Sequence, residues 1–393
     1  MAHVRLHTAV FSTGERFPVL LDHETGQPVI LPTRYVVDAR REFRQTGTIA
    51  KQLRVIGWFY HWAQAQGIDP EQRLRFGPAF DYAEVLGFCR FLRAGRKDKV
   101  IASLADGPHV LRPNTFNAYL AELEAFLIWA METQGLGGAS EPARAAARTA
   151  LRRLFRSQRL SALPSQKKYA LSDEELTRLL AIVDPRSADN PFNAQTRHRN
   201  YLIIRLLLET GLRRGELCKL RLEDLMLHGG SPYLKVVRSP DDPHDPRRHE
   251  PQVKTLNRSV PVSRPCALAL TVYVQKHRGR ARHPYVFTST RGGRPIWTGA
   301  LNEVLEQVVS AHPPFASKLS PHGLRHTFAT RLKNASQTSA LSGPDFDRAL
   351  NFIMGWTENS AQAAVYTRAY VETRADELVR VMHEGLRGLQ GSP

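Results

Sequence analysis

The chain has 393 residues, 42% of them hydrophobic, which is enough for the cores of two or three domains. It carries 55 Lys and Arg against 37 Asp and Glu, and the formal net charge of +18 favours a polyanionic partner, above all nucleic acid. A GC-rich genome would also raise the share of arginine. The three cysteines, Cys89, Cys218 and Cys266, stand alone, which excludes a disulfide framework and argues against a zinc site.

Residues 1–45 differ in character from the rest of the chain. The stretch "FPVLLDHETGQPVILP" has two short apolar runs around the turn-forming letters "HETGQP", which predicts a small β-hairpin or an extended arm. The first residues, "MAHVRLHTAVFSTGERF", lack the apolar core of a signal peptide. We therefore expect a soluble cytoplasmic protein.

Residues 46–157 carry a helical pattern and predict a small bundle of four helices. Apolar residues recur three and four positions apart in "LRVIGWFYHWA", in "VLGFC" and in "FNAYLAEL". Asn114 or Thr115 is expected to cap the third helix, and "EPARAAARTALRRLF", with Pro142 in its first turn, forms the fourth. Their basic outer faces are either solvated surface or a DNA-binding surface, and the overall charge favours DNA.

Residues 158–169 predict a linker, because Ser161 to Lys168 is polar, lacks periodicity and contains Pro164. A helix start follows at once. Ser172 as N-cap and Glu175 three residues later form the pattern of a capping box. A second domain therefore begins near residue 170 and is expected to extend to 393.

The second domain mixes helices with a few short strands. "NYLIIRLLLET" predicts a buried helix that ends at Gly211 and is too short to span a bilayer. Strands are expected at 233–237 and 258–262, and the segment "RSPDDPHDPRRHEPQ" between them predicts an exposed loop. Four further helices follow. The fold class is mainly α with a small antiparallel sheet (α+β).

The stretch "KLSPHGLRHTFATRL" gathers cationic and titratable side chains at a helix start. Ser320 caps the helix and Pro321 fits its first position. His322 and Arg325 lie three apart on one face, where free N–H groups already favour an anion. Taken alone, the pair is more often an ordinary surface pair than a phosphate site.

Other candidates are equally ambiguous on their own. Arg213 and Glu216 in "TGLRRGE" are either an oriented arginine or a plain salt bridge. Lys254 stands just before a strand, and Trp356 lies just past a helix that Gly355 stops, where an indole is either a donor or a hydrophobic plug. Tyr366 and Tyr370 follow four apart, a spacing that core aromatics also show.

Together, "TGLRRGE", "KTLNRSVP", "HGLRHTFAT", "MGW" and "VYT" follow one another in an order and spacing that resemble the tyrosine recombinase (phage integrase) superfamily. The resemblance covers residues 170–386. The helical bundle 46–157 is similar to that family's core-binding, SAM-like, DNA-binding domain in position and size. Residues 1–45 match no part of the family.

The resemblance implies a role for each matching position. Tyr366 would attack the phosphorus to form a covalent 3′-phosphotyrosine, and His322 would accept its proton. Lys254 would protonate the leaving 5′-oxygen, and Glu216 would support the first arginine. The implied catalytic set is Arg213, Lys254, His322, Arg325, Trp356 and Tyr366. No metal ligands and no cofactor are implied, because the two arginines would stabilise the phosphate charge.

Two spacings depart from the family's pattern. The segment "NASQTSALSGPDFDRALNF" lengthens the gap between Arg325 and Trp356, and the spacing from Trp356 to Tyr366 is about one residue long. Tyr370 is therefore a reserve candidate for the nucleophile. The C-terminal helix "TRADELVRVMHEGL" could dock on a neighbouring protomer or on its own domain.

The resemblance also implies partners. A site-specific recombinase of the integrase or transposase kind would act on double-stranded DNA as a homotetramer in the bacterial nucleoid, with possible accessory DNA-bending or directionality proteins and no membrane. Two alternatives remain open. One is a type IB topoisomerase or telomere resolvase with the same chemistry, and the other is a catalytically silent DNA-binding regulator.

Overall fold

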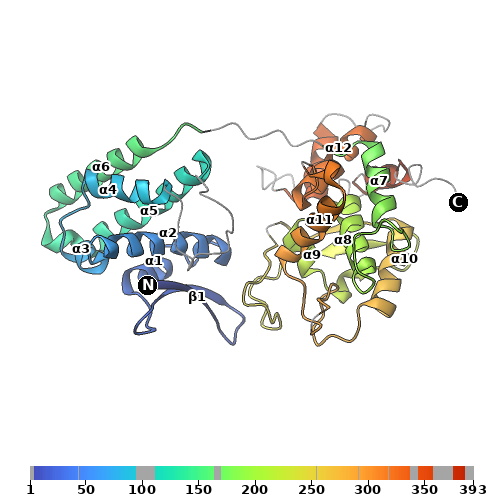
Figure 1. Cartoon of the computed structure of the whole chain (residues 1–393), viewed down its shortest axis with the longest axis horizontal. Coiled ribbons are helices and arrows are strands. Elements are labelled where there is room, and N and C mark those ends of the chain that lie inside the picture. Colours follow the sequence, from blue (N-terminus) through green and yellow to red (C-terminus); the bar gives the residue numbers. More distant parts are fainter. Residues whose placement is uncertain are drawn as a thin grey trace. The chain divides into compact units, whose positions relative to one another are not determined.

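The computed structural model describes residues 4–42, 44–93, 111–162, 170–253, 255–290, 292–316, 318–336, 344–356 and 375–385. The chain divides into two compact units, Met1–Ser165 and Gln166–Pro393 (Figure 1). The division falls within the segment expected to be a linker. Among the described helices, none is both long enough and apolar enough to cross a membrane.

The first unit opens with an antiparallel hairpin of β1 (Val4–Val10) and β2 (Arg16–Asp22), followed by α1 (Ile30–Ala39). A hairpin was one of the two expectations for this region, but its turn lies at residues 11–15, where the Phe11 N–H donates to the Glu15 carbonyl at 2.9 Å. The expected turn after Asp22 exists, yet it closes only an isolated bridge between Leu21 and Pro28. Proline has no N–H with which to extend a ladder, and the second apolar run leads instead into α1.

The helices of the first unit match the predicted bundle, with one short helix added. They are α2 (Thr46–Ala65), α3 (Pro70–Phe76), α4 (Tyr82–Arg93), α5 (Pro113–Gln134) and α6 (Glu141–Gln158), with the turn η2 (Gly135–Gly138) between the last two. The predicted cap of α5, Asn114 or Thr115, was wrong by two or three residues, because Arg112 is the N-cap. Proline is favoured at the first helical position, which fixes the start at Pro113.

The hairpin and the helices share one hydrophobic core. Leu20 of β2 is 1% exposed, and a Cβ on Gly57 of α2 would lie 3.3 Å from its methyl group. Tyr35 of α1 packs edge-on against Phe126 of α5 with ring centroids 5.3 Å apart. Residues 4–42 therefore pack as part of the first unit rather than as a free arm.

The second unit is helical with one small sheet. Its helices are α7 (Asp173–Val183), α8 (Arg197–Thr210), α9 (Arg214–Lys219), α10 (Arg264–Val272), α11 (Thr298–Ala311), α12 (Pro321–Ser336) and α13 (Pro344–Met354), with short turns η3 (Leu222–Asp224), η4 (Tyr273–His277) and η5 (Pro313–Phe315). Residues 375–385 are also helical. The capping box of Ser172 and Glu175 at α7 is confirmed.

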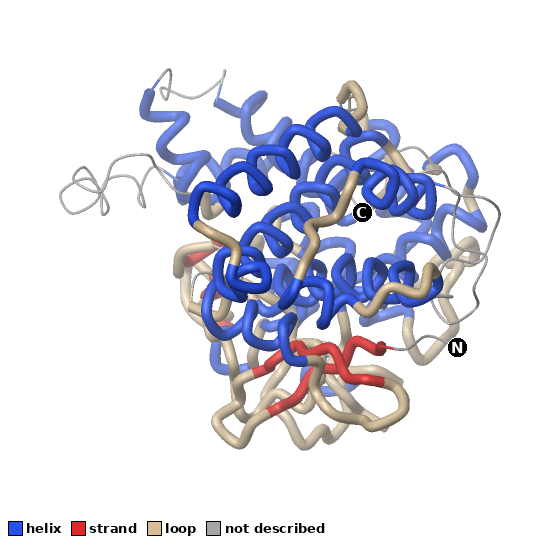
Figure 2. The backbone as a smooth tube through the Cα atoms, turned by 90° about the vertical axis from the view of Figure 1, so that its left-hand side faces the viewer, coloured by secondary structure: helices blue, strands red, loops and turns tan. Residues whose placement is uncertain are grey.

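The sheet has the antiparallel order β3 (Leu225–Met226), β4 (Tyr233–Val236) and β5 (Arg258–Pro261). Figure 2 shows that strands make up only a small part of a chain that is otherwise helices and loops. The two predicted strands are confirmed to within one residue. β3 escaped prediction because two residues are too few to show an alternating pattern. The fold class, mainly α with a small antiparallel sheet, is confirmed.

Helix α8 crosses the core of the second unit and ends at Gly211 in the left-handed conformation (φ 59°), as predicted. A Cβ at this position would lie 2.4 Å from the Phe328 ring of α12. Glycine is therefore needed for both the backbone turn and the close helix packing. The contact brings the start of α9 beside α12.

The helix at 375–385 packs on the core of its own unit. Ala375, Leu378, Val379 and Met382 are each at most 2% exposed and belong to the core cluster of the second unit. The His383 ring lies 3.3 Å from the Glu209 carbonyl at the end of α8. The sequence left open whether this helix docks on its own domain or on a neighbouring protomer. In this structure it docks on its own domain.

Candidate active site

The first arginine of the site lies at the start of α9. Arg213 is the N-cap residue, and its backbone N–H donates to Glu216 Oε2 at 2.7 Å. Its guanidinium Nη1 lies 3.5 Å from Glu216 Oε1 and also donates to the Met354 carbonyl at 3.2 Å. The side chain keeps 30% of its surface exposed, so its outer edge remains accessible to a ligand.

The second arginine lies on α12, which begins as predicted with Pro321 as its first residue. Ser320 Oγ accepts the Gly323 N–H at 2.9 Å. Leu324, Phe328 and Leu332 are fully buried, and His322 is exposed. The helix therefore anchors one face in the core and presents His322 near Arg325.

Backbone carbonyl oxygens orient Arg325. Its Nη1 donates to the Gly211 carbonyl, and its Nη2 donates to the Met354 carbonyl at 2.6 Å. The residue is only 5% exposed. Both acceptors belong to helix C-termini, whose partial negative charge favours a cation.

The C-terminus of α13 binds both Arg213 and Arg325 through a backbone carbonyl. Gly355 takes a left-handed conformation (φ 61°) and donates its N–H to the Phe352 carbonyl at 3.0 Å, while the Trp356 N–H donates to the Asn351 carbonyl at 2.8 Å. This is a Schellman cap, which confirms the predicted helix end. The cap does not use the last two carbonyls of the helix. The Met354 carbonyl accepts hydrogen bonds from Arg213 and Arg325, and the Ile353 carbonyl accepts one from Arg258 at 2.8 Å.

These groups line one cleft of about 680 Å³. The cleft residues are Arg213, Arg214, Gly215, Gln252, Thr298, Pro321, His322, Arg325, His326, Ala329, Met354 and Trp356. Trp356 is 41% exposed, and its ring centroid lies 5.9 Å from the Arg325 guanidinium carbon. Four of the predicted site residues, Arg213, His322, Arg325 and Trp356, therefore converge from three separate segments.

The other predicted positions, Lys254, Tyr366 and Tyr370, lie outside the described residues. Both neighbours of Lys254 are described, and they are fixed in the second unit. Val253 is 6% exposed and Thr255 is 2% exposed. Gln252, two residues before Lys254, lines the cleft itself.

A buried cluster of Glu216, Thr255 and Arg258 supports the cleft; we call it the Glu216 cluster. Arg258 Nη1 and Nη2 donate to the two carboxylate oxygens of Glu216 at 3.1 and 3.0 Å. The Thr255 hydroxyl donates to Glu216 Oε1 at 2.6 Å. Although burial acts to raise it, the charge of Arg258 holds the pKa of the Glu216 carboxyl below its usual value.

The sequence interpretation missed Arg258 as part of the site. Its signal was the alternation at the start of β5, where Arg258 and Val260 are buried and Ser259 between them is exposed. An arginine at an inward strand position requires a buried carboxylate, because an unpaired charge in a core is costly. Glu216, 42 residues earlier in the chain, supplies it.

The cleft carries a concentrated positive charge. Burial and the nearby charge of Arg213 together lower the pKa of Arg325 to about 10. At neutral pH the guanidinium is still protonated, so it holds its charge at a free-energy cost that burial and Arg213 impose. An anion bound between the two arginines would reduce that cost, and a phosphate group has the geometry to accept from both.

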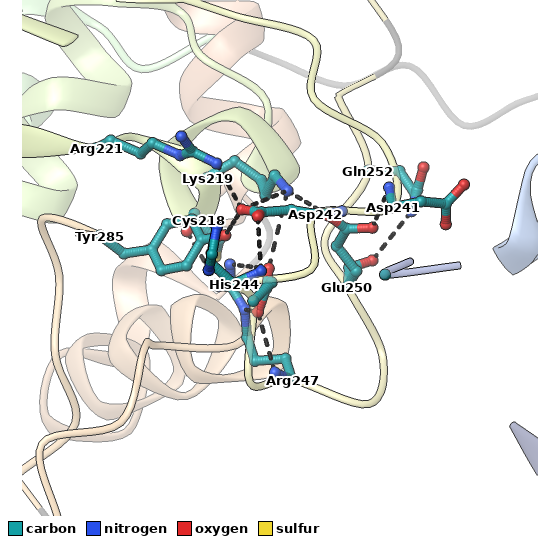
Figure 3. A network of polar contacts seen from close by, with 12 residues as sticks. Cys218, Lys219, Arg221, Asp241, Asp242, His244, Arg247, Glu250, Gln252 and Tyr285 are labelled. Carbon is teal, nitrogen blue, oxygen red and sulfur yellow. Dashed lines mark hydrogen bonds and ion pairs between the residues drawn. The ribbon is translucent and has the colours of Figure 1, made fainter. Parts of the chain in front are cut away.

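The segment between β4 and β5 forms a loop as predicted, and many of its residues are exposed, but three of its carboxylates are buried. Asp242, Asp245 and Glu250 are at most 8% exposed and surround the buried Lys219 of α9 (Figure 3). The Lys219 ammonium donates to Glu250 and lies 3.8 Å from Asp245 and 4.0 Å from Asp242. Pairing with a cation from a distant helix allows these charges to be buried.

Tyr285 and two arginines complete this loop network. Arg247 donates to both oxygens of Asp245 at 2.8 and 2.7 Å, and its guanidinium lies 4.4 Å from the Tyr285 ring centroid. Asp242 accepts from the Tyr285 hydroxyl at 2.6 Å and from Arg221 at 2.5 Å. The loop that leads to Lys254 is therefore anchored at Asp242, Asp245, Arg247 and Glu250.

Replacing Asp242 with asparagine is expected to lower the free energy of unfolding by about 2 kcal/mol at pH 7. Burial acts to raise the pKa of the Asp242 carboxyl, but hydrogen bonds from Tyr285, the His244 N–H and Arg221 lower it from 3.8 to about 2. This stabilisation is complete above about pH 4 and is lost as the pH falls through about 2.

Urea unfolding of both proteins between pH 7 and pH 3 measures this effect, and the two curves should approach each other at the acidic end. Asp189→Asn, at an exposed carboxylate of the same unit, is the control and should change stability little. A constant difference across the whole pH range would contradict the assignment.

The family comparison identifies the class of the protein. The model of the phage integrase family matches residues 170–372, just over half of the chain and nearly all of the second unit that carries the cleft. The chain therefore belongs to the phage integrase family. The resemblance seen in the sequence motifs is confirmed.

Curated relatives and a solved structure agree with this assignment. Tyrosine recombinase XerA of Thermococcus kodakarensis is 28% identical over 210 residues, which cover 53% of this chain and 61% of XerA. Tyrosine recombinase XerD of Mycobacterium tuberculosis is 29% identical over 163 residues, 40% of this chain and 46% of XerD. The chain thus matches about half to three fifths of these relatives' lengths.

The fold is similar to that of the Tn1549 transposon integrase, whose structure was solved in complex with a circular intermediate DNA. The two chains superpose with a TM-score of 0.51 at 18% identity, over 88% of this chain and 98% of the other. At this identity the likeness concerns the fold. The superposition covers residues of both units, because 88% of the chain is more than the second unit contains.

Proposed function

We propose that this protein is a site-specific DNA recombinase, which cuts and rejoins double-stranded DNA through a covalent 3′-phosphotyrosine. The observation that carries the proposal is the convergence of Arg213, His322, Arg325 and Trp356 in one basic cleft. Family membership and the net charge of +18 support it further.

Charge stabilisation is the part of the chemistry for which the described residues are best suited. A phosphodiester under attack gathers negative charge on its non-bridging oxygens, and donors fixed in advance stabilise that charge most strongly. Arg213 and Arg325 are both fixed by the Met354 carbonyl and approach the cleft from different helices. The cations of the protein thus supply the stabilisation that a metal ion would otherwise provide.

The remaining steps are assigned to residues by their place in the motifs. The Tyr366 oxygen forms a bond to phosphorus as the bond to the 5′-oxygen breaks, so the energy of the phosphodiester is kept in the phosphotyrosine. His322 takes the phenol proton, and Lys254 gives a proton to the leaving oxygen. Trp356 donates its indole N–H to a phosphate oxygen. Attack by a 5′-hydroxyl on the phosphotyrosine reverses these steps and rejoins the strand.

The proposal includes the wider assembly. The basic first unit contacts the same duplex as the catalytic unit, and four copies act on two duplexes. Accessory DNA-bending or directionality proteins would assist, and the site of action is the bacterial nucleoid. The long-range positive charge draws the protein to DNA and makes binding depend strongly on salt.

Tyr366→Phe is expected to abolish the covalent adduct with DNA, because it removes only the oxygen that attacks phosphorus. The assay incubates the protein with a nicked duplex made from the repeats that flank its encoding element, and resolves the products in SDS. Wild-type protein should give an adduct that resists SDS. Tyr370→Phe is the matched control and should retain it.

Two outcomes would change the proposal. If Tyr370→Phe loses the adduct and Tyr366→Phe keeps it, the nucleophile is Tyr370. If wild-type protein gives no adduct on any flanking repeat, a DNA-binding regulator becomes the better reading. Strand joining between two different duplexes separates a recombinase from a topoisomerase.

A further inference from the structure

The Glu216 cluster connects three parts of the cleft that lie far apart in sequence. The Glu216 carboxylate accepts the backbone N–H of Arg213 at 2.7 Å, the hydroxyl of Thr255 at 2.6 Å and the guanidinium of Arg258. Its side chain has no exposed surface. This buried carboxylate thus accepts hydrogen bonds from three different residues around the cleft.

Thr255 is the member of the cluster whose position matters most for the chemistry. Its hydroxyl donates to Glu216 and accepts from Arg258 Nη1 at 3.0 Å, and the residue is 2% exposed. A hydroxyl with both roles filled has a single orientation. Thr255 directly follows Lys254, so the cluster fixes the backbone immediately beside the proposed general acid.

The same residue touches the end of α13. A Cβ on Gly355 would lie 2.7 Å from the Cβ and Cγ2 of Thr255 and 2.8 Å from Arg258 Nη1, which is too close for any side chain. Arg258 also donates to the Ile353 carbonyl at 2.8 Å. Thr255 and Gly355 therefore pack directly against each other, and Trp356 is the next residue after Gly355.

From this arrangement we infer that Thr255 is a positioning residue for DNA cleavage, because it holds the backbone next to Lys254 against the end of α13, which leads into Trp356. The inference rests on the proposed function, since it assumes that Lys254 protonates the leaving oxygen. Lys254 and Trp356 each adjoin a member of the Thr255–Gly355 contact, and Arg213 bonds to Glu216 through its own backbone. Loosening the Thr255 hydroxyl should therefore affect proton delivery before it affects phosphate binding.

The test uses two variants and two DNA substrates. Thr255→Val keeps the shape of the side chain and removes the hydroxyl, whereas Thr255→Ser keeps the hydroxyl. One nicked duplex carries the natural 5′-oxygen at the scissile position, and the other carries sulfur there. Sulfur leaves as a thiolate without needing a proton, because thiols are far more acidic than alcohols.

We expect Thr255→Val to slow adduct formation about 10- to 100-fold on the oxygen substrate, the range associated with a small misplacement of a catalytic group. On the sulfur substrate its rate should return to within about 3-fold of wild type, and Thr255→Ser should stay near wild type on both. The thermal midpoints of both variants, measured in parallel, show whether the folded protein is intact.

Lys254→Ala is the reference for proton delivery, and it should be slow on oxygen and restored on sulfur. If Lys254→Ala is restored but Thr255→Val is equally slow on both substrates, or is never slow, the positioning role is wrong and the proposed function stands. If Lys254→Ala is not restored by sulfur, the proposed role of Lys254 is wrong and the inference falls with it.

Discussion

Replacing Arg325 with glutamine is expected to slow formation of the covalent adduct by about 100- to 1000-fold, the usual effect of removing one donor that stabilises a developing oxyanion. Arg325 is 5% exposed and held by the Gly211 and Met354 carbonyls, so it needs no reorganisation when a phosphate arrives. Single-turnover cleavage of a nicked duplex measures the rate. The loss should appear in the rate at saturating DNA more than in the affinity.

A charge-matched control separates this local effect from general attraction to DNA. Arg186→Gln removes one positive charge at a side chain that is 92% exposed and lies far from the cleft in sequence. It should lower the affinity for DNA slightly and leave the saturated rate unchanged. Equal losses in the two variants would mean that Arg325 contributes only to the overall field of the protein.

The lowered pKa of Arg325 gives the same variant a second readout. Because burial and Arg213 make the Arg325 charge costly, bound DNA should raise the melting temperature of wild-type protein more than that of Arg325→Gln. Differential scanning calorimetry with and without the duplex compares them. A DNA-induced rise of the same size in both proteins would show that phosphate does not relieve this cost.

Glu216→Gln is expected to reduce the free energy of unfolding of the second unit by about 3–5 kcal/mol, the range for leaving one member of a buried ion pair without its partner. Arg258 would keep its charge in a site where its side chain is 1% exposed. Cleavage should fall as well, because Arg213, Thr255 and the end of α13 all depend on the same carboxylate.

The double variant Glu216→Gln with Arg258→Met tests this explanation. Removing both charges should recover much of the stability lost by the single change, without restoring cleavage. Glu175→Gln is the matched control, since Glu175 pairs with Lys318 at a partly exposed site (29%) and should cost about 1 kcal/mol or less. A double variant as unstable as the single one would argue against the ion pair as the cause.

Local patterns in the sequence were enough to predict much of the fold. Helices with a regular apolar face, such as the one around Phe88, were predictable because burial recurs every three or four residues. The cap at Ser172 and the stop at Gly211 were predictable because the chemistry of a helix end lies within a few residues.

Features that depend on distant partners were not predictable in this way. The charged loop before Lys254 was predicted to be exposed because Lys219, its buried counterion, is 31 residues away from Glu250 in the sequence. The alternation in β5 indicates that Arg258 is buried, but it does not identify the partner, because Glu216 lies on another element. The site residues named from motifs stay predictions of chemistry, although four of them do share one cleft.

The end of α13 has a consequence for how variation in this chain should be interpreted. Main-chain oxygens of Ile353 and Met354, and not their side chains, aim the three guanidiniums. Any apolar residue of similar volume could stand at either position without altering that aim. A deletion that rotated the helix by one residue would move both carbonyls and misdirect all three arginines at once. At these two positions the length of the helix therefore matters more for function than the identity of the residue.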